Sequence, residues 1–466
     1  MQCSRTRRNM NMRFRASISL LAGLLALGLS TQAPAYEVHD GPTGVIKLVP
    51  EKTFKGYTLF APTVKCTTTY LIDMNGDVVH TWKSKYPPGL YATLLPNGNL
   101  LRAAAPKDQP VKIGGAGGII EEMDWNGNVV WSYTMLTENE IQHHCFDRMP
   151  NGNTMILGWE RKTPAEFQAK GRKPGTWPEE VKIKGQAVRD FWVDFVREVD
   201  KNGKTVWEWH AWDHIGTGPD QLDINFALPT PVGPGYDSFD WSHFNTVQYL
   251  PKTDQILLNS RNFSEFYIVD KKSGKIVKRW GNPAAYGKGT RPEWYYDGTQ
   301  QVFGEHNATM LPNGNVQIFD NGSERPEGNR SRVIEVDPAS GKVVWQYAAN
   351  GANSFFSYRQ GAAERLPNGN VLVTSTHQGH LFEVTPTGEV VWEFVNPIMA
   401  GQAKPVFSDR EDAVPNAHQT FTNMIHRAYR YAPDYPGLKG KDLSVKAPLL
   451  PGYPKFFEVW KPTAVK

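Results

Sequence analysis

The stretch Phe303-Gly-Glu-His-Asn-Ala-Thr-Met-Leu-Pro-Asn-Gly-Asn-Val-Gln-Ile-Phe319 has the pattern of a β-hairpin. An Asn-Gly turn between two largely apolar runs is a strong short-range signal for two antiparallel strands. Variants of this hairpin recur, with a proline at positions 96, 150, 251, 312 and 367, and a degenerate sixth copy runs from His426 to Pro433. We predict that each copy forms an inner pair of strands, and that the pair quoted above begins at His306.

A second unit alternates strictly with this hairpin. It starts with Asp or Thr, continues through a Gly-centred turn, and ends with β-branched residues that are usually followed by Trp. Its six copies begin at Asp73, Asp124, Asp200, Asp270, Asp337 and Thr385. The pattern of strand, short turn and strand again predicts a hairpin, which we assign to an outer pair of strands.

The two repeated units together predict an all-β, six-bladed β-propeller. Grouping each inner pair with the outer pair that follows it produces five four-stranded blades. The last inner pair, around His426 to Pro433, then joins the first outer pair, around Tyr70 to Trp82. This pairing of N-terminal and C-terminal strands closes the ring and removes exposed sheet edges. Two or three separate β domains would not explain the alternation, so we predict one catalytic domain over residues 36–466.

Residues 1–35 have the composition of a signal peptide. Five arginines precede an apolar run from Ile18 to Leu29, and Ala33-Pro-Ala35 follows as a small-residue cleavage site. The apolar run is too short to span a membrane, and no later segment approaches that length. We therefore expect cleavage near Ala35 and a secreted, periplasmic protein with no membrane span.

The charge and the cysteines of the mature part restrict its partners and cross-links. The leader holds five of the 51 basic residues and none of the 47 acidic ones, which leaves 46 basic against 47 acidic residues. Such a balance offers no electrostatic case for binding nucleic acid. Cys66 and Cys145 remain after cleavage, and we expect both to be buried, unpaired thiols.

The long connections indicate where a functional site would be built. Both kinds of hairpin turn are short and should lie on one face of the propeller, so the other connections fall on the opposite face. Several of these are long, at roughly 160–190, 210–240, 281–305 and 396–423. Long loops on a rigid scaffold commonly carry binding and catalytic residues.

We call the face with the long connections the decorated face. The residue six positions before each inner proline should line the central channel at this face. The copies carry Leu90, His144, Asn245, His306, Gly361 and, in the degenerate copy, Arg427. His243 lies on the same side of an alternating strand as Asn245. The second strands end at Arg261 in the third copy and Thr376 in the fifth. His143, next to His144, and His426 are further candidates for substrate binding. His426 lies one residue out of register, so that only a bulge or a shifted turn would point it inward.

The expected cluster of histidines and one arginine suits a small tetrahedral oxyanion. Arginine stays ionised and presents a rigid fork of donors to such oxygens. A neutral histidine donates from one ring nitrogen and attacks from the other. Sulfuryl and phosphoryl groups react through loose transition states in which positioning and charge stabilisation dominate. The residues alone therefore favour transfer or hydrolysis of an anionic ester.

Several of these motifs resemble the bacterial arylsulfate sulfotransferases. They are His144 before Met-Pro-Asn-Gly-Asn, Ser242-His243-Phe-Asn245, Asn259-Ser-Arg261, and His306 ahead of Phe319-Asp-Asn-Gly322. The resemblance implies a periplasmic six-bladed propeller that moves a sulfuryl group from a phenolic sulfate ester to a phenol, with no nucleotide donor and no cofactor. It implies that His306 is the nucleophile that becomes transiently sulfated. It also implies that the sulfuryl group and the leaving phenol are contacted by His243, Asn245, Arg261 and His144, with Thr374 or Thr376 as a further contact.

Three other functions compete with this interpretation. The histidines would suit a copper or zinc enzyme, although Arg261 is an unfavourable neighbour for a metal ion, and we expect none. The decorated face would also suit a non-catalytic propeller that binds a ligand or partner. The tryptophans at the blade ends leave open a quinone-dependent dehydrogenase, but packing explains them equally well. The best-known arylsulfate sulfotransferases have an additional N-terminal β domain, which we do not expect here because only about thirty residues separate Ala35 from the first blade unit.

Overall fold

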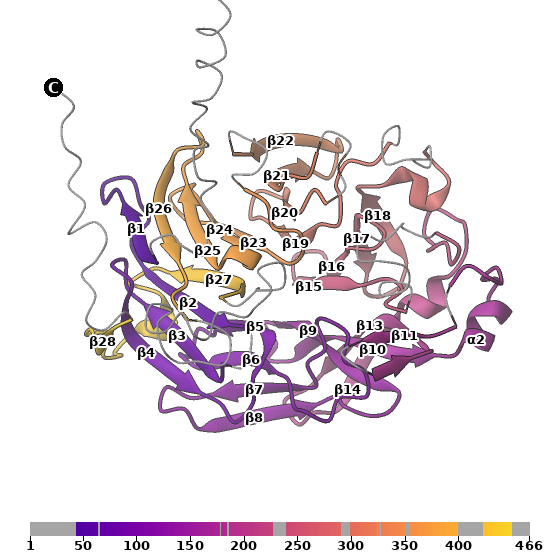
Figure 1. Cartoon of the computed structure of the whole chain (residues 1–466), viewed down its shortest axis with the longest axis horizontal. Coiled ribbons are helices and arrows are strands. Elements are labelled where there is room, and N and C mark those ends of the chain that lie inside the picture. The colour runs from indigo at the N-terminus through magenta and orange to yellow at the C-terminus, as the bar shows by residue number, and fades with distance from the viewer. Residues whose placement is uncertain are drawn as a thin grey trace, which may run out of the picture. The chain divides into compact units, whose positions relative to one another are not determined.

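The computed structural model describes residues 43–63, 66–177, 179–183, 186–226, 239–289, 299–323, 325, 328–349, 355–398 and 423–449. All of them belong to one compact unit of the chain, and the expected signal peptide lies outside them. Antiparallel sheets arranged as six blades surround a central axis (Figure 1), which confirms the predicted β-propeller. Among the described residues, no helix has the length and apolar character needed to cross a membrane.

Blades 2 to 5 are each built from four antiparallel strands, which follow one another from the channel outward. Blade 2 contains β5 (Pro88–Leu94), β6 (Leu100–Ala104), β7 (Ile119–Met123) and β8 (Val129–Thr134). Blade 3 contains β9 (Glu140–Arg148), β10 (Thr154–Lys162), β13 (Phe191–Val199) and β14 (Thr205–His210). Blade 4 contains β15 (Phe244–Leu250), β16 (Gln255–Ser260), β17 (Glu265–Asp270) and β18 (Ile276–Trp280). Blade 5 contains β19 (His306–Met310), β20 (Val316–Asp320), β21 (Arg332–Asp337) and β22 (Lys342–Tyr347).

Blades 6 and 1 have a fifth strand at their outer edge, which the four-stranded repeat did not predict. Blade 6 contains β23 (Ala362–Arg365), β24 (Val371–Ser375), β25 (His380–Val384), β26 (Val390–Val395) and then β1 (Gly44–Leu48). Blade 1 contains β27 (Ile425–Tyr431), β2 (Tyr57–Pro62), β3 (Thr68–Ile72), β4 (Asp77–Lys83) and then β28 (Ala447–Pro448). The added strands cover edges that would otherwise present unpaired backbone groups.

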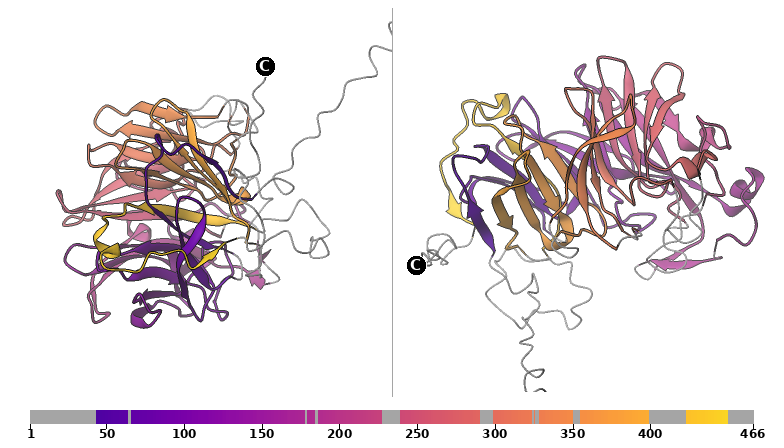
Figure 2. Two further views of the ribbon diagram at one scale, coloured as in Figure 1. Left: turned by 90° about the vertical axis from the view of Figure 1, so that its left-hand side faces the viewer. Right: turned by 90° about the horizontal axis from the view of Figure 1, so that it is seen from above.

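The ring is closed by strands from both ends of the described chain, but not in the predicted proportion. We expected both inner strands of blade 1 to come from the C-terminal part of the chain, whereas only the innermost, β27, does so, and it pairs antiparallel with β2. The other C-terminal strand, β28, lies at the outer edge of the blade and pairs with β4. The side view shows β27, in yellow, beside the indigo N-terminal strands (Figure 2). The degenerate copy does not turn back after Pro433, because β2 already occupies the second position of the blade. The six innermost strands contact one another in sequence around the channel, from β5 to β27 and back to β5.

The connections between strands carry the remaining short elements. The connection from β10 to β13 holds helix α2 (Pro164–Ala169) and a hairpin of β11 (Val181–Ile183) and β12 (Gln186–Val188). Single 3-10 turns are found at η2 (Ala211–His214), η3 (Pro283–Tyr286), η4 (Thr376–Gln378) and η7 (Pro436–Leu438).

The repeated Pro-Asn-Gly-Asn turn is explained by its hydrogen bonds. Its glycine takes a positive φ, as at Gly314 (φ 89). This conformation is energetically unfavourable for any residue that has a side chain. The first asparagine caps the turn, with Asn313 Oδ1 accepting from Asn315 N at 3.0 Å. The second asparagine donates to a glutamate on the third strand, since Asn315 Nδ2 lies 2.6 Å from Glu335 Oε1. The same bond recurs in the pairs Asn99–Glu122, Asn153–Glu198 and Asn370–Glu383.

Tryptophans on the outer strands connect each blade to the next. Trp82 Nε1 donates to Asp124 O at 3.0 Å, which lies in the outer turn of the following blade. Equivalent bonds run from Trp131, Trp207, Trp280 and Trp345 to Lys201, Lys271, Gly341 and Pro386, respectively. Trp392 Nε1 donates to Met74 O at 3.0 Å and so completes the circuit. These tryptophans therefore pack neighbouring blades together. Packing was one of the two explanations that the sequence offered for them, beside a quinone-dependent dehydrogenase.

The core lies between neighbouring blades rather than inside one sheet. Second strands such as β6, β20 and β24 are buried at every position, because each is covered by a blade on both faces. The outermost strand β8 is largely exposed. Cys66 and Cys145 are both buried and unpaired, which confirms the expectation of free thiols.

Candidate active site

Irregular pairing at the start of the innermost strands shapes the site. In β9 the partners jump from Ile156↔Phe146 to Gly158↔Gln142, so that extra residues bulge out around His143 and His144. Comparable irregularities occur in β5, β15, β19 and β27. A bulge turns side chains that strict alternation would separate toward the same side. His426 and Arg427 lie within the irregular part of β27, which is the bulge that an inward-facing His426 required.

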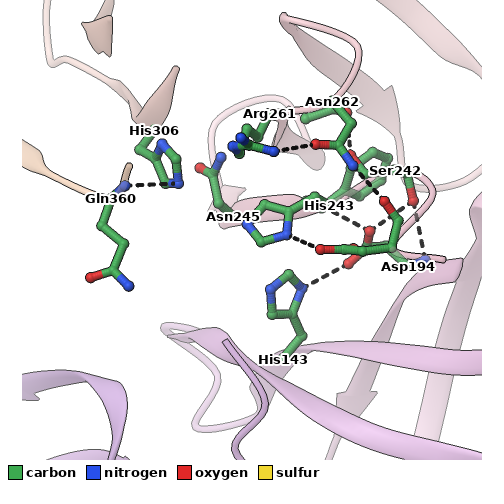
Figure 3. Close-up of polar contacts among 12 residues, drawn as sticks. His143, Asp194, Ser242, His243, Asn245, Arg261, Asn262, His306 and Gln360 are labelled. Atoms are coloured by element: carbon green, nitrogen blue, oxygen red, sulfur yellow. Dashed lines mark hydrogen bonds and ion pairs between the residues drawn. The ribbon is translucent and has the colours of Figure 1, made fainter. Parts of the chain in front are cut away.

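His306 stands at the start of β19 and is held through both ring nitrogens. Nδ1 lies 2.7 Å from Asn321 Oδ1 and 3.1 Å from Gly304 O. The Asn321 amide is oriented by its Nδ2, which donates to Ser357 O and Gln360 O at 2.6 Å each. Nδ1 must therefore carry the hydrogen and donate it to a neutral acceptor. Nε2 keeps its lone pair and accepts a long 3.3 Å bond from Gln360 N (Figure 3).

His243 is backed by a carboxylate instead of an amide. Its Nδ1 lies 2.5 Å from Asp240 Oδ2, and its ring centroid is 6.1 Å from that of His306. Arg261 is coupled to the same aspartate, because its Nη1 donates to Asn262 Oδ1 at 2.8 Å and Asn262 Nδ2 donates to Asp240 O (Figure 3). The bond to Asp240 fixes the orientation of the His243 ring and occupies its Nδ1, so that Nε2 is the ring nitrogen left for other contacts.

His143 is the second histidine with a carboxylate partner. Its Nδ1 lies 2.8 Å from Asp194 Oδ1, while Ser242 Oγ and Phe244 N donate to Asp194 Oδ2 at 2.7 and 2.8 Å. The His143 ring stacks on Trp159 with centroids 3.6 Å apart. These contacts hold His143 in a rigid position beside His144 and His243.

His144 and His426 complete the cluster of histidines, with ring centroids 5.0 Å apart. Both are buried. Among the described residues, Nδ1 of His144 and both ring nitrogens of His426 have no hydrogen-bond partner. Arg427 is also buried and crosses the channel, where its Nη2 donates to Asn245 O at 2.6 Å. The guanidinium of Arg427 therefore belongs to the wall beneath the histidines.

A small cavity of about 40 Å³ opens onto this cluster. Of the predicted site residues, the structure brings His306, His243, Arg261 and His144 together in its wall. The other lining residues are Leu90, Gly114, Gly115, Asp240, Arg359 and Gln360. Two guanidinium groups, from Arg261 and Arg359, and three imidazoles thus surround one space, which is an arrangement for an anion.

Three predicted contact residues are placed differently and do not line this cavity. Asn245 is fully buried, and its amide donates to Glu305 O at 2.8 Å and accepts from Asn307 N at 3.2 Å. Asn245 therefore forms hydrogen bonds with the backbone on both sides of His306. Thr376 Oγ1 donates to His426 O, and Thr374 Oγ1 accepts from Ala428 N, both at 3.2 Å. Direct contact of these three side chains with a substrate stays a prediction.

Burial sets the protonation of the cluster. It is the main cause that holds the pKa values of His143, His144, His306 and His426 well below the ordinary 6.5, and nearby positive charge lowers them further. For His306 the added charges are those of His243, Arg261 and Arg427. A neutral His306 is therefore maintained at neutral pH, with its lone pair available.

Sequence reasoning missed the residues that orient these histidines. Asp240 and Asn321 were within or next to the motifs but carried no assigned role, while Asp194, Arg359 and Gln360 were not considered. Asp240 stands three residues before His243, and Asn321 directly follows β20, the strand that pairs with β19. These positions could have indicated the partners of His243 and His306, but spacing alone does not show which side chains meet.

The same cluster contains the residues that suit a metal ion. One ligand atom from each of His143, His144 and His243 lies within 4.8 Å of the other two.

A six-bladed propeller whose channel mouth holds histidines and arginines is a scaffold for chemistry on a small anionic group. Residues 43–407 match the family model described as Arylsulfotransferase (ASST), and the chain belongs to this family. The arylsulfate sulfotransferase AssT of Escherichia coli O6:H1 (strain CFT073) is 26% identical over 248 residues, which is 41% of this chain and 40% of that protein. The protein of the same name from Lelliottia amnigena is 25% identical over 247 residues, with the same 41% and 40% coverage.

These alignments span about 40% of the length of each curated relative, so the activity of the whole protein does not follow from them. Among solved structures, a protein of unknown function from Bacteroides caccae aligns with a TM-score of 0.45 at 10% identity, over 73% of this chain and 94% of that one. That likeness carries no functional inference.

Proposed function

We propose that this chain transfers a sulfuryl group from an aryl sulfate ester to a phenolic acceptor, and that His306 carries the group between the two. The observation that supports this most is a difference between partners at the same ring atom. His306 Nδ1 donates to the neutral amide of Asn321, whereas His143 and His243 have carboxylates at Nδ1. A neutral acceptor at Nδ1 leaves His306 uncharged, with the lone pair of Nε2 engaged only in the long 3.3 Å bond from Gln360 N, and a nucleophile requires such a lone pair.

In the first half-reaction, Nε2 of His306 attacks the sulfur of the donor. A nitrogen–sulfur bond forms while the sulfur–oxygen bond to the aryl group breaks. The departing phenolate takes a proton from Nε2 of His243, whose charge Asp240 stabilises at 2.5 Å. The sulfated His306 ring keeps its Nδ1 hydrogen, and because Asn321 is not a base the ring stays cationic and remains a good leaving group.

In the second half-reaction, the acceptor phenol gives its proton to His243, which is now neutral. The phenolic oxygen attacks sulfur, the nitrogen–sulfur bond breaks, and neutral His306 is restored. Atoms and charge balance over the two steps, with no nucleotide and no cofactor required. The burial of His306, which is 1% exposed, disfavours water as an alternative acceptor.

The charge of the sulfuryl oxygens is matched by the cations of the cavity wall. Arg261 is held by Asn262 and has its guanidinium in the same cavity as His306 and His243. Preorganised donors around a developing charge commonly contribute several kcal/mol to a transition state, about 2.7–4 for one lost donor in a well-studied case. The backbone amide of Gln360, which faces Nε2 of His306, is a further donor for the incoming group.

The test is a nucleotide-free assay of the purified protein with 4-nitrophenyl sulfate, with and without phenol. We expect nitrophenol release that depends on phenol, and formation of phenyl sulfate in equal amount. His306→Asn should abolish both while its thermal unfolding matches the parent. Release without phenol would instead indicate a sulfatase, and no release from folded protein would refute the proposed reaction.

We also propose that residues 1–35 direct export and that the protein acts in the periplasm. The proposal is based on the arginines and the apolar run at the start of the sequence. N-terminal sequencing of protein from the periplasmic fraction should begin near Tyr36. Retention of the arginine-rich segment in cytoplasmic protein would contradict it.

A further inference from the structure

Three histidines of the cluster have the spacing of a metal site. Ligand atoms of His143, His144 and His243 all lie within 4.8 Å of one another, and the ring centroid of His143 is 4.3 Å from that of His144 and 4.9 Å from that of His243. Zinc–nitrogen bonds of about 2.0–2.1 Å in a tetrahedral site place ligand nitrogens roughly 3.4 Å apart. Small rotations of the rings would therefore bring three nitrogens to one ion.

Two of the three rings already have the backing that metal-binding histidines usually have. His143 Nδ1 is 2.8 Å from Asp194 Oδ1, and His243 Nδ1 is 2.5 Å from Asp240 Oδ2. A carboxylate at one nitrogen fixes the ring and leaves the other nitrogen as the ligand, as in carboxylate–histidine–zinc arrangements. This second feature distinguishes the site from histidines that are merely close together.

The nitrogens on the opposite side of the rings lack partners. Among the described residues, the buried atoms His143 Nε2 and His144 Nδ1 have no hydrogen-bond partner. A buried polar atom in this state costs roughly 1–3 kcal/mol, which a bound ligand would relieve. His144, His243 and Asp240 also line the cavity, so that an ion has a route to them.

The charges near this point permit a divalent cation despite the neighbouring guanidinium. Asp194 and Asp240 are both buried directly behind ligating rings. Burial and the neighbouring Asp240 raise the pKa of Asp194 well above its usual range, and a divalent ion bound in front of the two rings would favour the ionised form of this carboxyl. The guanidinium of Arg261 is oriented by Asn262 Oδ1 and is not one of the three ligands.

We propose that Zn²⁺ binds His143, His144 and His243, and that the ion blocks sulfuryl transfer. The block follows because His243 cannot exchange a proton with a phenol while its Nε2 coordinates a metal. Bound Zn²⁺ and the bound aryl sulfate donor therefore exclude one another. The binding half of this inference is independent of the proposed reaction, whereas the block rests on it.

Binding is tested on full-length protein stripped with chelator and then titrated with Zn²⁺ by calorimetry. We expect one ion per chain with micromolar or tighter affinity, and Co²⁺ as a substitute should give the intense visible bands of tetrahedral coordination. His144→Asn and, separately, His243→Asn should each weaken binding about tenfold or more. His214→Asn is the matched control, since His214 stacks on Trp209 outside the cluster, and it should bind as the parent does.

Outcomes of the titration that contradict the site are distinct from those that contradict the reaction. Absence of saturable binding, or parental affinity in both histidine variants, would overturn the site even if the transferase is active. Where activity is present, added Zn²⁺ should inhibit it, a higher donor concentration should relieve the inhibition, and EDTA should reverse it. Full activity of protein with one bound Zn²⁺ would overturn the block.

Discussion

The amide oxygen of Asn321 lies 2.7 Å from Nδ1 of His306, at the ring atom where His143 and His243 instead meet carboxylates. The three rings lie close enough to share one site, and yet their partners differ in charge. A carboxylate stabilises an imidazolium, whereas an amide only selects which nitrogen carries the hydrogen. Asn321 is thereby a positioning residue for the proposed nucleophile, and it also connects the 357–360 loop to His306 through its Nδ2.

Exchanging this amide for a carboxylate should change how activity depends on pH. In Asn321→Asp, the added negative charge raises the pKa of His306, which burial otherwise holds well below 6.5. Protonated His306 is not nucleophilic, so the acid limb of the kcat/KM profile should move to higher pH. Asn396→Asp is the control, because Asn396 Nδ2 also donates to two backbone carbonyls but without a histidine contact. A profile identical to that of the control would contradict the role of Asn321.

Removing the charge behind His243 should affect poor leaving groups most. In Asp240→Asn, the ring of the proposed general acid His243 loses its carboxylate partner, and general acid assistance is commonly worth about 10²–10⁴ in rate. Transfer from phenyl sulfate should therefore fall much further than transfer from 4-nitrophenyl sulfate, whose phenolate departs more readily. The measurement is the ratio of kcat/KM for the two donors. An equal loss for both would show that Asp240 acts only through structure.

Asn245 should act on His306 through the backbone. The change Asn245→Ala removes bonds to Glu305 O and Asn307 N. Glu305 O keeps its bond from Asn259 Nδ2 at 3.1 Å, but leaving the buried Asn307 N unpaired costs roughly 1–3 kcal/mol. We expect a lower urea midpoint and a reduced kcat, with KM for the donor nearly unchanged. A large rise in KM at full stability would instead support the direct substrate contact that the sequence predicted.

The buried histidines should make the folded chain sensitive to acid. His143, His144, His306 and His426 have pKa values well below 6.5 in the folded state, while in the unfolded chain they bind protons near that pH. The unfolded state therefore takes up more protons as pH falls, and the free energy of unfolding decreases. Each histidine contributes up to about 1.4 kcal/mol per pH unit.

His426→Gln should make this slope shallower in urea titrations below about pH 6. His210→Gln is the control. The pKa of His210 is raised through its bond to Glu160, so that below about pH 6 His210 is protonated in both states and should not affect the slope. An unchanged slope for His426→Gln would mean that His426 is protonated in the folded chain.

The repeats predicted most of the fold because their residues have local functions. Asn315 bonds Glu335 and Trp82 bonds the next blade through contacts that recur around the ring, so spacing alone was sufficient to identify blades. The site was only partly predictable, because it depends on departures from the repeat. His243 (φ 42) and Asn307 (φ 54) take left-handed backbone conformations next to bulges, and alternation cannot predict where such residues point.

Closure of the ring by N-terminal and C-terminal strands was predicted correctly, but the origin of the second strand of blade 1 was mispredicted for a related reason. Pro433 preserved the turn position of the hairpin repeat, yet no strand follows it in the second position of blade 1, because β2 fills that position. The local motif was read correctly as the end of a strand, but a competing strand hundreds of residues earlier in the chain decided the pairing.

The strand that closes the ring also has a consequence for biosynthesis. β27 is the last long strand of the described chain to leave the ribosome or the translocation machinery, and it carries His426 and Arg427 into the channel. Until it arrives, β2 exposes an unpaired edge and the histidine cluster lacks one wall. The proposed active site therefore has all its walls only after β27 has been synthesised, and products truncated before residue 425 should be inert toward sulfate esters.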